Sequence, residues 1–265
     1  MFLYTKAYLQ SRRGRRILQP AALLSLVLLC GQVVAQTATP ILVELFTSEG
    51  CSSCPPAESF LRALDSAQPV SGAQLIVLEE HVDYWDDQGW KDPFSSHLFT
   101  TRQSDYVDRL RVDRGPYTPQ MVIDGSEAFV GSDRAQAGRA VGKALKEAKV
   151  KVEITSVRVE NGKISLHINT GPLASKADVV VAVALDHAES QVLRGENGGR
   201  KLEHVAVVER LTTIGKIRQG DAFSKDANVD MGHDGQEHRI VIFVQQSGQG
   251  KILGAAMARV PQKSG

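Results

Sequence analysis

Cys51 and Cys54, in the stretch "EGCSSCPPAE" (residues 49–58), are the residues whose type and spacing best suit chemistry. Two cysteines separated by two residues can exchange disulfides, because one sulfur attacks a substrate disulfide and the other resolves the mixed disulfide. The same pair can instead form a local structural bridge, or it can bind a soft metal ion. The elements around the pair decide between these alternatives.

The flanking residues predict a strand before the cysteines and a helix after them. The apolar run "ILVELFTS" (41–48) is typical of a buried strand. Pro55 and Pro56 fit the first turn of a helix, where a missing N–H costs nothing. The two prolines also indicate that the regular helix begins after Cys54, which moves Cys51 away from the helix amides that would lower its pKa. The two serines between the cysteines offer hydroxyl hydrogen bonds instead.

A second signal is "YTPQMVIDG" (117–125), where Thr118-Pro119 precedes a predicted strand and an Asp-Gly hairpin turn. In thioredoxin-like folds, the loop that faces the CxxC pair carries a cis-proline at this place in the element order. We therefore expect Pro119 to be cis and to shape a substrate groove. The backbone of Thr118 would pair with a substrate peptide as an added strand, and Tyr117 would contact the same substrate.

"HVDYWDDQGW" (81–90) follows a second predicted buried strand. His81 and Asp83 lie two residues apart, so on an extended segment they would share a face. His81 could then shuttle protons or stabilise a thiolate, and Trp85 with its aromatic neighbours could form an apolar wall for a peptide. The alternative is an aromatic loop that packs over the helix predicted at 94–111.

Two further arrangements stay open. Cys51, Cys54 and His81 together would give two sulfurs and one imidazole, a set that suits copper. A Gly-rich segment of the second half gathers polar residues that either reach the redox face, bind an anion or form a solvated connection. These residues are Arg194, Asn197, Arg200 and His204.

The order of elements predicts the fold class. Over residues 40–149 the order is strand, helix, strand, helix, hairpin, helix, which predicts an α/β mixed sheet with helices on both faces. The last of these helices is expected over 133–149. Over residues 150–262, alternating apolar residues and an Asn161-Gly162 turn predict an antiparallel β-sandwich.

The N-terminus predicts export. Lys6 and four arginines lie within the first 16 residues, and an apolar run follows that ends near Ala35. We interpret residues 1–35 as a cleaved signal peptide, so that the membrane is contacted only transiently and the protein becomes periplasmic or secreted. Cleavage would remove Cys30, and an oxidising compartment would let the other two cysteines pair.

Charge and motif content exclude several classes of protein. The formal net charge is +1, and without the five basic residues of the signal peptide it becomes −4, which argues against a nucleic-acid binder. The sequence has no phosphate-binding glycine loop, serine nucleophile elbow or paired-carboxylate motif, and no cofactor is predicted. The expected partner is a protein or a small thiol. No feature indicates the oligomeric state.

Four stretches carry a resemblance to a known family: "VELFTSEGCSSCPPAE", "HVDYWDDQGWKDPF", "YTPQMVIDG" and "RGENGGRKLEHVAVVERL". They resemble a bacterial secreted, thioredoxin-like family known as domain of unknown function 1223, over roughly residues 41–260. "ILVELF" is similar to the central strand of thioredoxins, and Glu44 matches the buried carboxylate there within one inserted residue. The resemblance implies that Cys51 attacks a disulfide, Cys54 resolves it and Glu44 relays protons to Cys54.

Overall fold

The structure is a computed structural model that describes residues 1–3, 38–233 and 235–261. The signal peptide predicted over residues 1–35 lies outside the described residues, apart from its first three. Within the described part of the chain, no helix combines the length and the apolar character needed to cross a membrane. Export, and with it a periplasmic or secreted location, stays a prediction.

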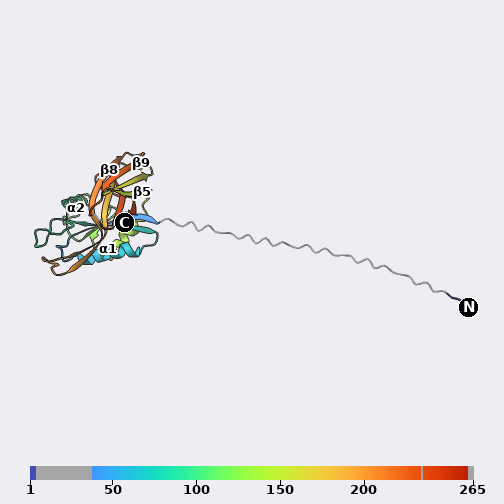
Figure 1. Cartoon of the computed structure of the whole chain (residues 1–265), viewed down its shortest axis with the longest axis horizontal. Coiled ribbons are helices and arrows are strands. Elements are labelled where there is room, and N and C mark those ends of the chain that lie inside the picture. The colour runs from blue at the N-terminus through green and yellow to red at the C-terminus, as the bar shows by residue number, and fades with distance from the viewer. Residues whose placement is uncertain (4–37, 234, 262–265) are drawn as a thin grey trace. The chain divides into compact units, whose positions relative to one another are not determined.

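A large mixed sheet forms the framework of the described residues (Figure 1). Its strands are β1 (Thr39–Thr47), β2 (Ala73–His81), β3 (Gln120–Ile123), β4 (Glu127–Val130), β7 (Ala177–Gln191), β8 (Lys201–Ile217), β10 (His238–Gln246) and β11 (Ile252–Arg259). Their order across the sheet is β11-β10-β7-β8-β2-β1-β3-β4. β1 and β2 are parallel, whereas β3 runs antiparallel to β1. The mixed sheet predicted from the first half is therefore confirmed.

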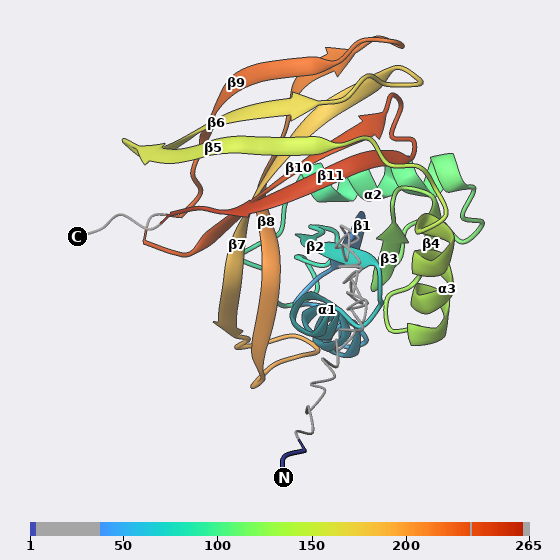
Figure 2. The same cartoon turned by 90° about the vertical axis from the view of Figure 1, so that its right-hand side faces the viewer.

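A smaller antiparallel sheet consists of β5 (Val152–Glu160), β6 (Lys163–Thr170) and β9 (Phe223–Asp230). It forms a layer next to β10 and β11 in Figure 2. Its buried residues, such as Ile164 and Ile168, share a hydrophobic core with Val181 of β7 and Ile242 of β10. Antiparallel pairing in the second half is thus as predicted.

Helices cover both faces of the β1–β4 end of the large sheet. α1 (Pro55–Ala67) and α3 (Arg134–Ala144) pack on the face that carries Val43, and α2 (His97–Leu110) packs on the face that carries Leu42. The two faces separate because successive side chains of a strand point to opposite sides. Both faces are apolar, which explains why "ILVELF" has a continuous apolar pattern instead of an alternating one.

The sequence predicts a separate two-layer sandwich for the second half, but the structure shows that four of its strands continue the sheet of the first half. These strands are β7, β8, β10 and β11, and they belong to that sheet because β8 pairs in parallel with β2, with Val207 opposite Glu79. β8 is 17 residues long, so it pairs with β7 along its length and also with the free edge of β2. The smaller sheet then forms the second layer over only part of the large one.

The two predicted hairpin turns are confirmed, whereas the predicted end of the third helix is wrong. Asp124-Gly125 and Asn161-Gly162 turn their hairpins with positive φ angles of 48° and 59°, and of 51° and 71°. α3 ends at Ala144, earlier than the predicted 149. The chain turns there, and the ammonium of Lys149 donates to the Asp124 carboxylate (2.7 Å) and to the Ile252 carbonyl (3.0 Å).

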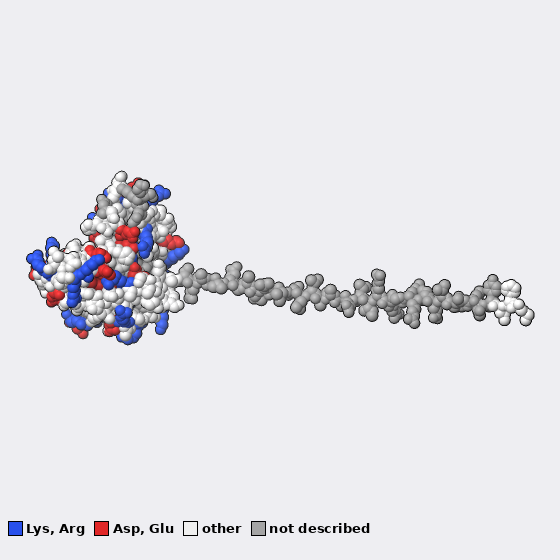
Figure 3. Space-filling view, turned by 60° about the horizontal axis from the view of Figure 1, so that its bottom comes forward, with Lys and Arg blue, Asp and Glu red and all other residues white. Residues whose placement is uncertain are grey.

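Charged residues of both signs are interspersed on the face shown in Figure 3. Surface ion pairs among the described residues include Lys143 with Glu127 (2.8 Å) and Lys201 with Glu189 (2.7 Å). Exposed pairs of this kind contribute about 0–1 kcal/mol each. The surface therefore adds little to stability, and the apolar cores hold the sheets together. That the protein has no nucleic-acid partner stays a prediction.

Candidate functional site

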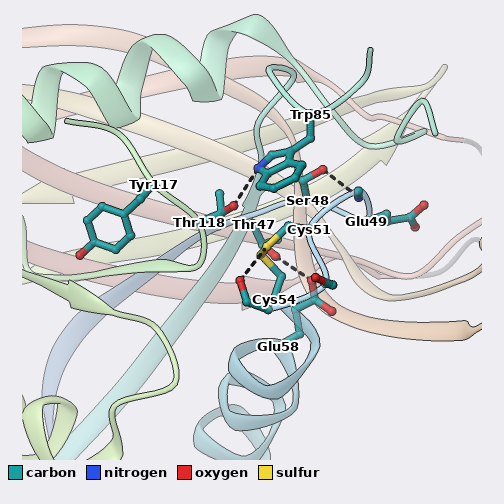
Figure 4. Close-up of a disulfide and its surroundings, with 12 residues drawn as sticks. Thr47, Ser48, Glu49, Cys51, Cys54, Glu58, Trp85, Tyr117 and Thr118 are labelled. Atoms are coloured by element: carbon teal, nitrogen blue, oxygen red, sulfur yellow. Dashed lines mark hydrogen bonds between the residues drawn. A yellow bond between two sulfur atoms is a disulfide. The ribbon is translucent and has the colours of Figure 1, made fainter. Parts of the chain in front are cut away.

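Cys51 and Cys54 form a disulfide between the end of β1 and the start of α1 (Figure 4). Both cysteines have an exposed fraction of 0%, whereas Ser52 and Ser53 between them are exposed. The bridge therefore lies directly beneath the surface, and neighbouring segments must cover its sulfurs.

The two prolines set the local geometry as predicted. Cys54 is the N-cap residue of α1, and Pro55 and Pro56 fill the first two helical positions. The first amides of the helix, from Ala57 (2.8 Å) and Glu58 (3.2 Å), both donate to the carbonyl of Cys54. They are occupied there, so the Cys51 sulfur depends on another donor. The Ser53 hydroxyl lies 3.3 Å from the Cys51 sulfur, so one of the two serines makes the predicted hydroxyl contact.

The Thr118-Pro119 loop and Trp85 lie together beside the disulfide, and Trp85 also packs against the hydrophobic core that contains Phe99 of α2. The Thr118-Pro119 peptide is cis. The Thr118 hydroxyl accepts a hydrogen bond from the Trp85 indole N–H (2.8 Å), and both residues are drawn beside the disulfide in Figure 4. Tyr117 differs: its carbonyl accepts from the Gln103 amide (2.7 Å), and Figure 4 shows its ring pointing away from the disulfide.

Gly131 lets the proline loop approach α1. A Cβ atom there would lie 2.7 Å from Leu45 Cδ1, 3.1 Å from Ala57 Cβ and 3.2 Å from Pro119 Cβ. We expect Gly131→Ala to lower the free energy of unfolding by about 1–3 kcal/mol in urea titrations, because the loop and helix must separate. The matched control is Gly138→Ala in α3, where nothing lies within 4 Å. It should be neutral or should raise stability by up to about 1 kcal/mol. Equal effects of the two substitutions would contradict this packing.

His81 and Asp83 do not share a face. His81 ends β2 and is fully buried, and its Nδ1 lies 2.7 Å from Asp92 Oδ2. The chain turns after β2, and Asp83 instead accepts from the Thr100 hydroxyl (2.6 Å) at the start of α2. The shared face would require an extended segment, and the strand ends too early to provide one.

Glu44 lies on the α2 face of β1, opposite the face that α1 covers, because it alternates with Val43 and Leu45. Its carboxylate accepts from Arg102 Nε (2.7 Å) and from the Tyr106 hydroxyl (2.7 Å). This placement does not support a relay from Glu44 to Cys54. The carboxylate one helical turn after Cys54 is that of Glu58.

A buried polar layer adjoins the disulfide and was largely missed from the sequence. Glu58 accepts from the Thr47 hydroxyl (2.6 Å). Burial, together with the charge of Glu79, raises the pKa of Glu58 to about 7. His204, from β8, lies with its Nδ1 2.7 Å from Glu79 Oε1. The one signal in the sequence was the pair of glutamates that ends an otherwise apolar strand, "QLIVLEEH".

Opposite charges outweigh burial in setting the pKa values of Glu79 and His204. Burial alone would raise the pKa of Glu79, but the charge of His204 and the hydrogen bond from it outweigh burial and lower the pKa to about 2. Burial likewise opposes the charged form of His204, but Glu79 and Glu49 raise its pKa to about 9. Donor atoms of Glu79, His81 and His204 all lie within 4.8 Å of one another. Among the described residues, this group of possible metal ligands includes no cysteine sulfur, which gives the copper alternative no support.

The Gly-rich loop between β7 and β8 covers the disulfide. The Asn197 amide donates to the carbonyls of Glu49 (2.9 Å) and Cys51 (3.0 Å). The Glu196 carboxylate accepts from the backbone N–H of Ser52 (3.0 Å). Of the three alternatives for this loop, the structure shows the one in which it reaches the cysteines.

The four stretches that carry the family resemblance meet at this site. The backbone N–H of Glu49 donates to Asp92 Oδ2 (2.8 Å), which joins the first stretch to the second. The hydrogen bond from Trp85 joins the second to the third, and Asn197 joins the fourth to the first. Segments that are distant in the sequence therefore build one constellation.

Comparison with solved structures identifies a relative of similar fold. Protein AGR_C_4864 from Agrobacterium tumefaciens is 26% identical, with a TM-score of 0.66 over 87% of this chain and 98% of that one. OgpA from Akkermansia muciniphila is 11% identical, with a TM-score of 0.24 over 43% of this chain and 29% of that one. The β-glucosidase from Kluyveromyces marxianus is 13% identical, with a TM-score of 0.23 over 43% and 14%. The latter two are too dissimilar to support an argument.

A protein family matches most of the chain. No protein of curated function matches it significantly. The family described as "Protein of unknown function (DUF1223)" matches residues 42–245, which include the disulfide, the proline loop and the covering loop. The chain therefore belongs to the DUF1223 family.

Proposed function

We propose that the protein is an exported, thioredoxin-like thiol–disulfide oxidoreductase that acts through Cys51 and Cys54. The observation that carries the proposal is the disulfide at the N-terminus of α1, with the Thr118-Pro119 loop against the same helix. The order β1-α1-β2-α2-β3-β4-α3, with β2-β1-β3-β4 side by side, agrees with a thioredoxin-like arrangement. The substrate is a protein or a small thiol, and no organic cofactor is needed.

The reaction starts from the oxidised form that the structure shows. A thiolate of a substrate dithiol attacks the Cys51 sulfur, and the bond between Cys51 and Cys54 breaks. Cys54 leaves as a thiolate and takes up a proton. The second substrate thiolate then attacks the substrate sulfur of the mixed disulfide and releases Cys51. The substrate loses two electrons, which reduce the Cys51–Cys54 disulfide, and the reverse sequence reduces a substrate disulfide.

Burial of both sulfurs means that a substrate must displace part of the cover. The cover includes Asn197 from the β7–β8 loop and Trp85, whose Cβ lies 3.1 Å from the position of a Cβ at Gly50. Loops are commonly the least stable parts of a fold, so displacement of this one is the expected route to Cys51.

The Cys54→Ser variant tests the proposal directly. Without the resolving sulfur, a mixed disulfide between Cys51 and a substrate should accumulate, and it should be recovered by non-reducing electrophoresis and mass spectrometry. The Cys51→Ser variant is the matched control, and it should trap much less. If neither variant captures a partner in the cells that produce the protein, the exchange reaction is excluded.

A structural disulfide within a binding module is the second candidate, and the 0% exposure of both cysteines favours it. In that case the bridge should resist glutathione in the folded protein. Its removal by a double Cys→Ser substitution should lower the melting temperature without loss of a reaction. Measuring the reduction potential separates the two, because structural bridges typically lie below about −300 mV.

A further inference from the structure

The imidazoles of His81 and His204 meet edge to face at the carboxylate of Glu79. Their ring centroids are 4.9 Å apart, and the rings cross at 77°. Glu79 Oε1 lies 3.3 Å from His81 Nε2 and 2.7 Å from His204 Nδ1. All three side chains have an exposed fraction of 0%. Two nitrogens and one oxygen thus converge on one point, from β2 and β8.

The other nitrogen of each imidazole faces a second carboxylate. His81 Nδ1 lies 2.7 Å from Asp92 Oδ2, and His204 Nε2 lies 3.3 Å from Glu49 Oε1. Histidines that bind metals almost always donate the remaining ring N–H to a carboxylate, a carbonyl or water, which fixes the tautomer and the ring orientation. His81 is held in that way by Asp92, whereas His204 Nε2 lies near Glu49 without a hydrogen bond. The inner nitrogens of both rings are directed at Glu79.

One of the inner nitrogens lacks a hydrogen bond. His81 Nε2 is buried and makes none, although Glu79 Oε1 lies 3.3 Å away, because the two groups are not aligned for it. Buried polar groups without a partner are uncommon and mark strain, function or an ion. This nitrogen is therefore an independent sign of a ligand at the centre of the group.

We propose that Glu79, His81 and His204 bind a divalent transition-metal ion of the Zn²⁺ class. Two imidazole nitrogens and a carboxylate oxygen are ligands that zinc takes, at about 2.0–2.2 Å. Tetrahedral ligands at that distance stand about 3.3 Å from one another. Glu79 Oε1 lies 3.3 Å from His81 Nε2 and 2.7 Å from His204 Nδ1, and all three atoms lie within 4.8 Å of one another. Glu58 offers a fourth ligand, since its Oε2 lies 4.0 Å from His204 Nδ1.

Phe94 supplies a route for the ion. Its ring packs edge-on against both imidazoles, with centroid distances of 5.4 Å to His81 and 5.6 Å to His204. Phe94 is only half-buried, and it lines a surface pocket of about 490 Å³ together with His187 and Glu189. Rotation of this one ring would open the pocket to the buried ligands.

The test measures zinc binding by the purified protein. After treatment with a chelator and dialysis against buffered Zn²⁺, we expect one zinc per chain. X-ray absorption at the zinc edge should show two imidazoles and further oxygen ligands, without sulfur. Glu79→Gln, which preserves side-chain volume, should weaken zinc binding by more than about a hundredfold. Substituting a residue that only orients a metal ligand already lowers metal affinity by about 10–100-fold. The matched control is His97→Ala, whose side chain is 80% exposed, and it should bind one zinc.

The proposal is overturned if the folded wild-type protein retains no zinc, or if its absorption spectrum shows sulfur ligands. It is also overturned if Glu79→Gln, folded by circular dichroism, binds as tightly as the wild type. Should that variant not fold, the wild-type stoichiometry and spectrum decide alone. A Cys51→Ser/Cys54→Ser double variant should keep its zinc, so failure of the exchange reaction and failure of the metal site can be distinguished.

Discussion

Replacing Arg102 by leucine should lower the free energy of unfolding by about 3–5 kcal/mol, the usual cost of removing one partner of a buried ion pair. Its side chain is 6% exposed, and its Nε lies 2.7 Å from Glu44 Oε1 and 3.6 Å from Glu80 Oε1. It also donates to the Tyr106 hydroxyl (3.1 Å). Without Arg102, two buried carboxylates would face each other with no cation.

The loss should depend on pH. Burial and then the charge of Glu44 raise the pKa of Glu80 well above its ordinary value. A carboxyl whose folded pKa is raised favours the folded state in its protonated form, and its cost appears as pH rises through that pKa. The deficit of Arg102→Leu should therefore be smaller in mildly acidic than in alkaline buffer.

Unfolding of the wild type and of Arg102→Leu by guanidinium chloride, in mildly acidic and in alkaline buffer, measures this effect. Arg109→Leu, on the exposed side of the same helix, is the matched control and should change stability by no more than about 0.5 kcal/mol. If the midpoint of Arg102→Leu equals that of the wild type, Arg102 does not compensate the charges of Glu44 and Glu80 as described.

The substitution Asn197→Ala should accelerate reduction of the Cys51–Cys54 disulfide by dithiothreitol about tenfold to a hundredfold. The side-chain amide makes two hydrogen bonds to the chain around the disulfide, at 2.9 and 3.0 Å. Such bonds contribute about 0.5–1.5 kcal/mol each, and each 1.36 kcal/mol corresponds to about a tenfold change in rate. Their loss should favour the open loop through which a reductant reaches Cys51.

The rate of reduction is measured by stopping samples at successive times with a thiol-labelling reagent and determining the labelled fraction. Arg194→Ala, in an exposed part of the same loop, is the matched control and should leave the rate unchanged. A melting curve shows whether Asn197→Ala unfolds the whole protein or only frees the loop. An unchanged rate in a stable Asn197→Ala variant would mean that the loop does not limit access.

Many local features followed from the sequence. The strand over 41–48, the helix start at Pro55 and the Asp124-Gly125 and Asn161-Gly162 turns depend on neighbouring residues, whose patterns predict them. The way in which the second half joins the first did not follow from the sequence. Pairing between β2 and β8 joins residues more than a hundred positions apart, and no local pattern encodes the choice of edge.

For the candidate site, too, some features followed from the sequence and others only from the tertiary structure. By itself, the sequence determined which two cysteines are close enough to pair and where the prolines start the helix, because spacing and propensity act over a few residues. Only the tertiary structure decided that Glu44 and Glu58 lie on different faces of the sheet, that Asn197 closes over Cys51 and that His204 reaches Glu79. These outcomes depend on strand pairing and on the balance of buried charges, which arise once distant segments pack together.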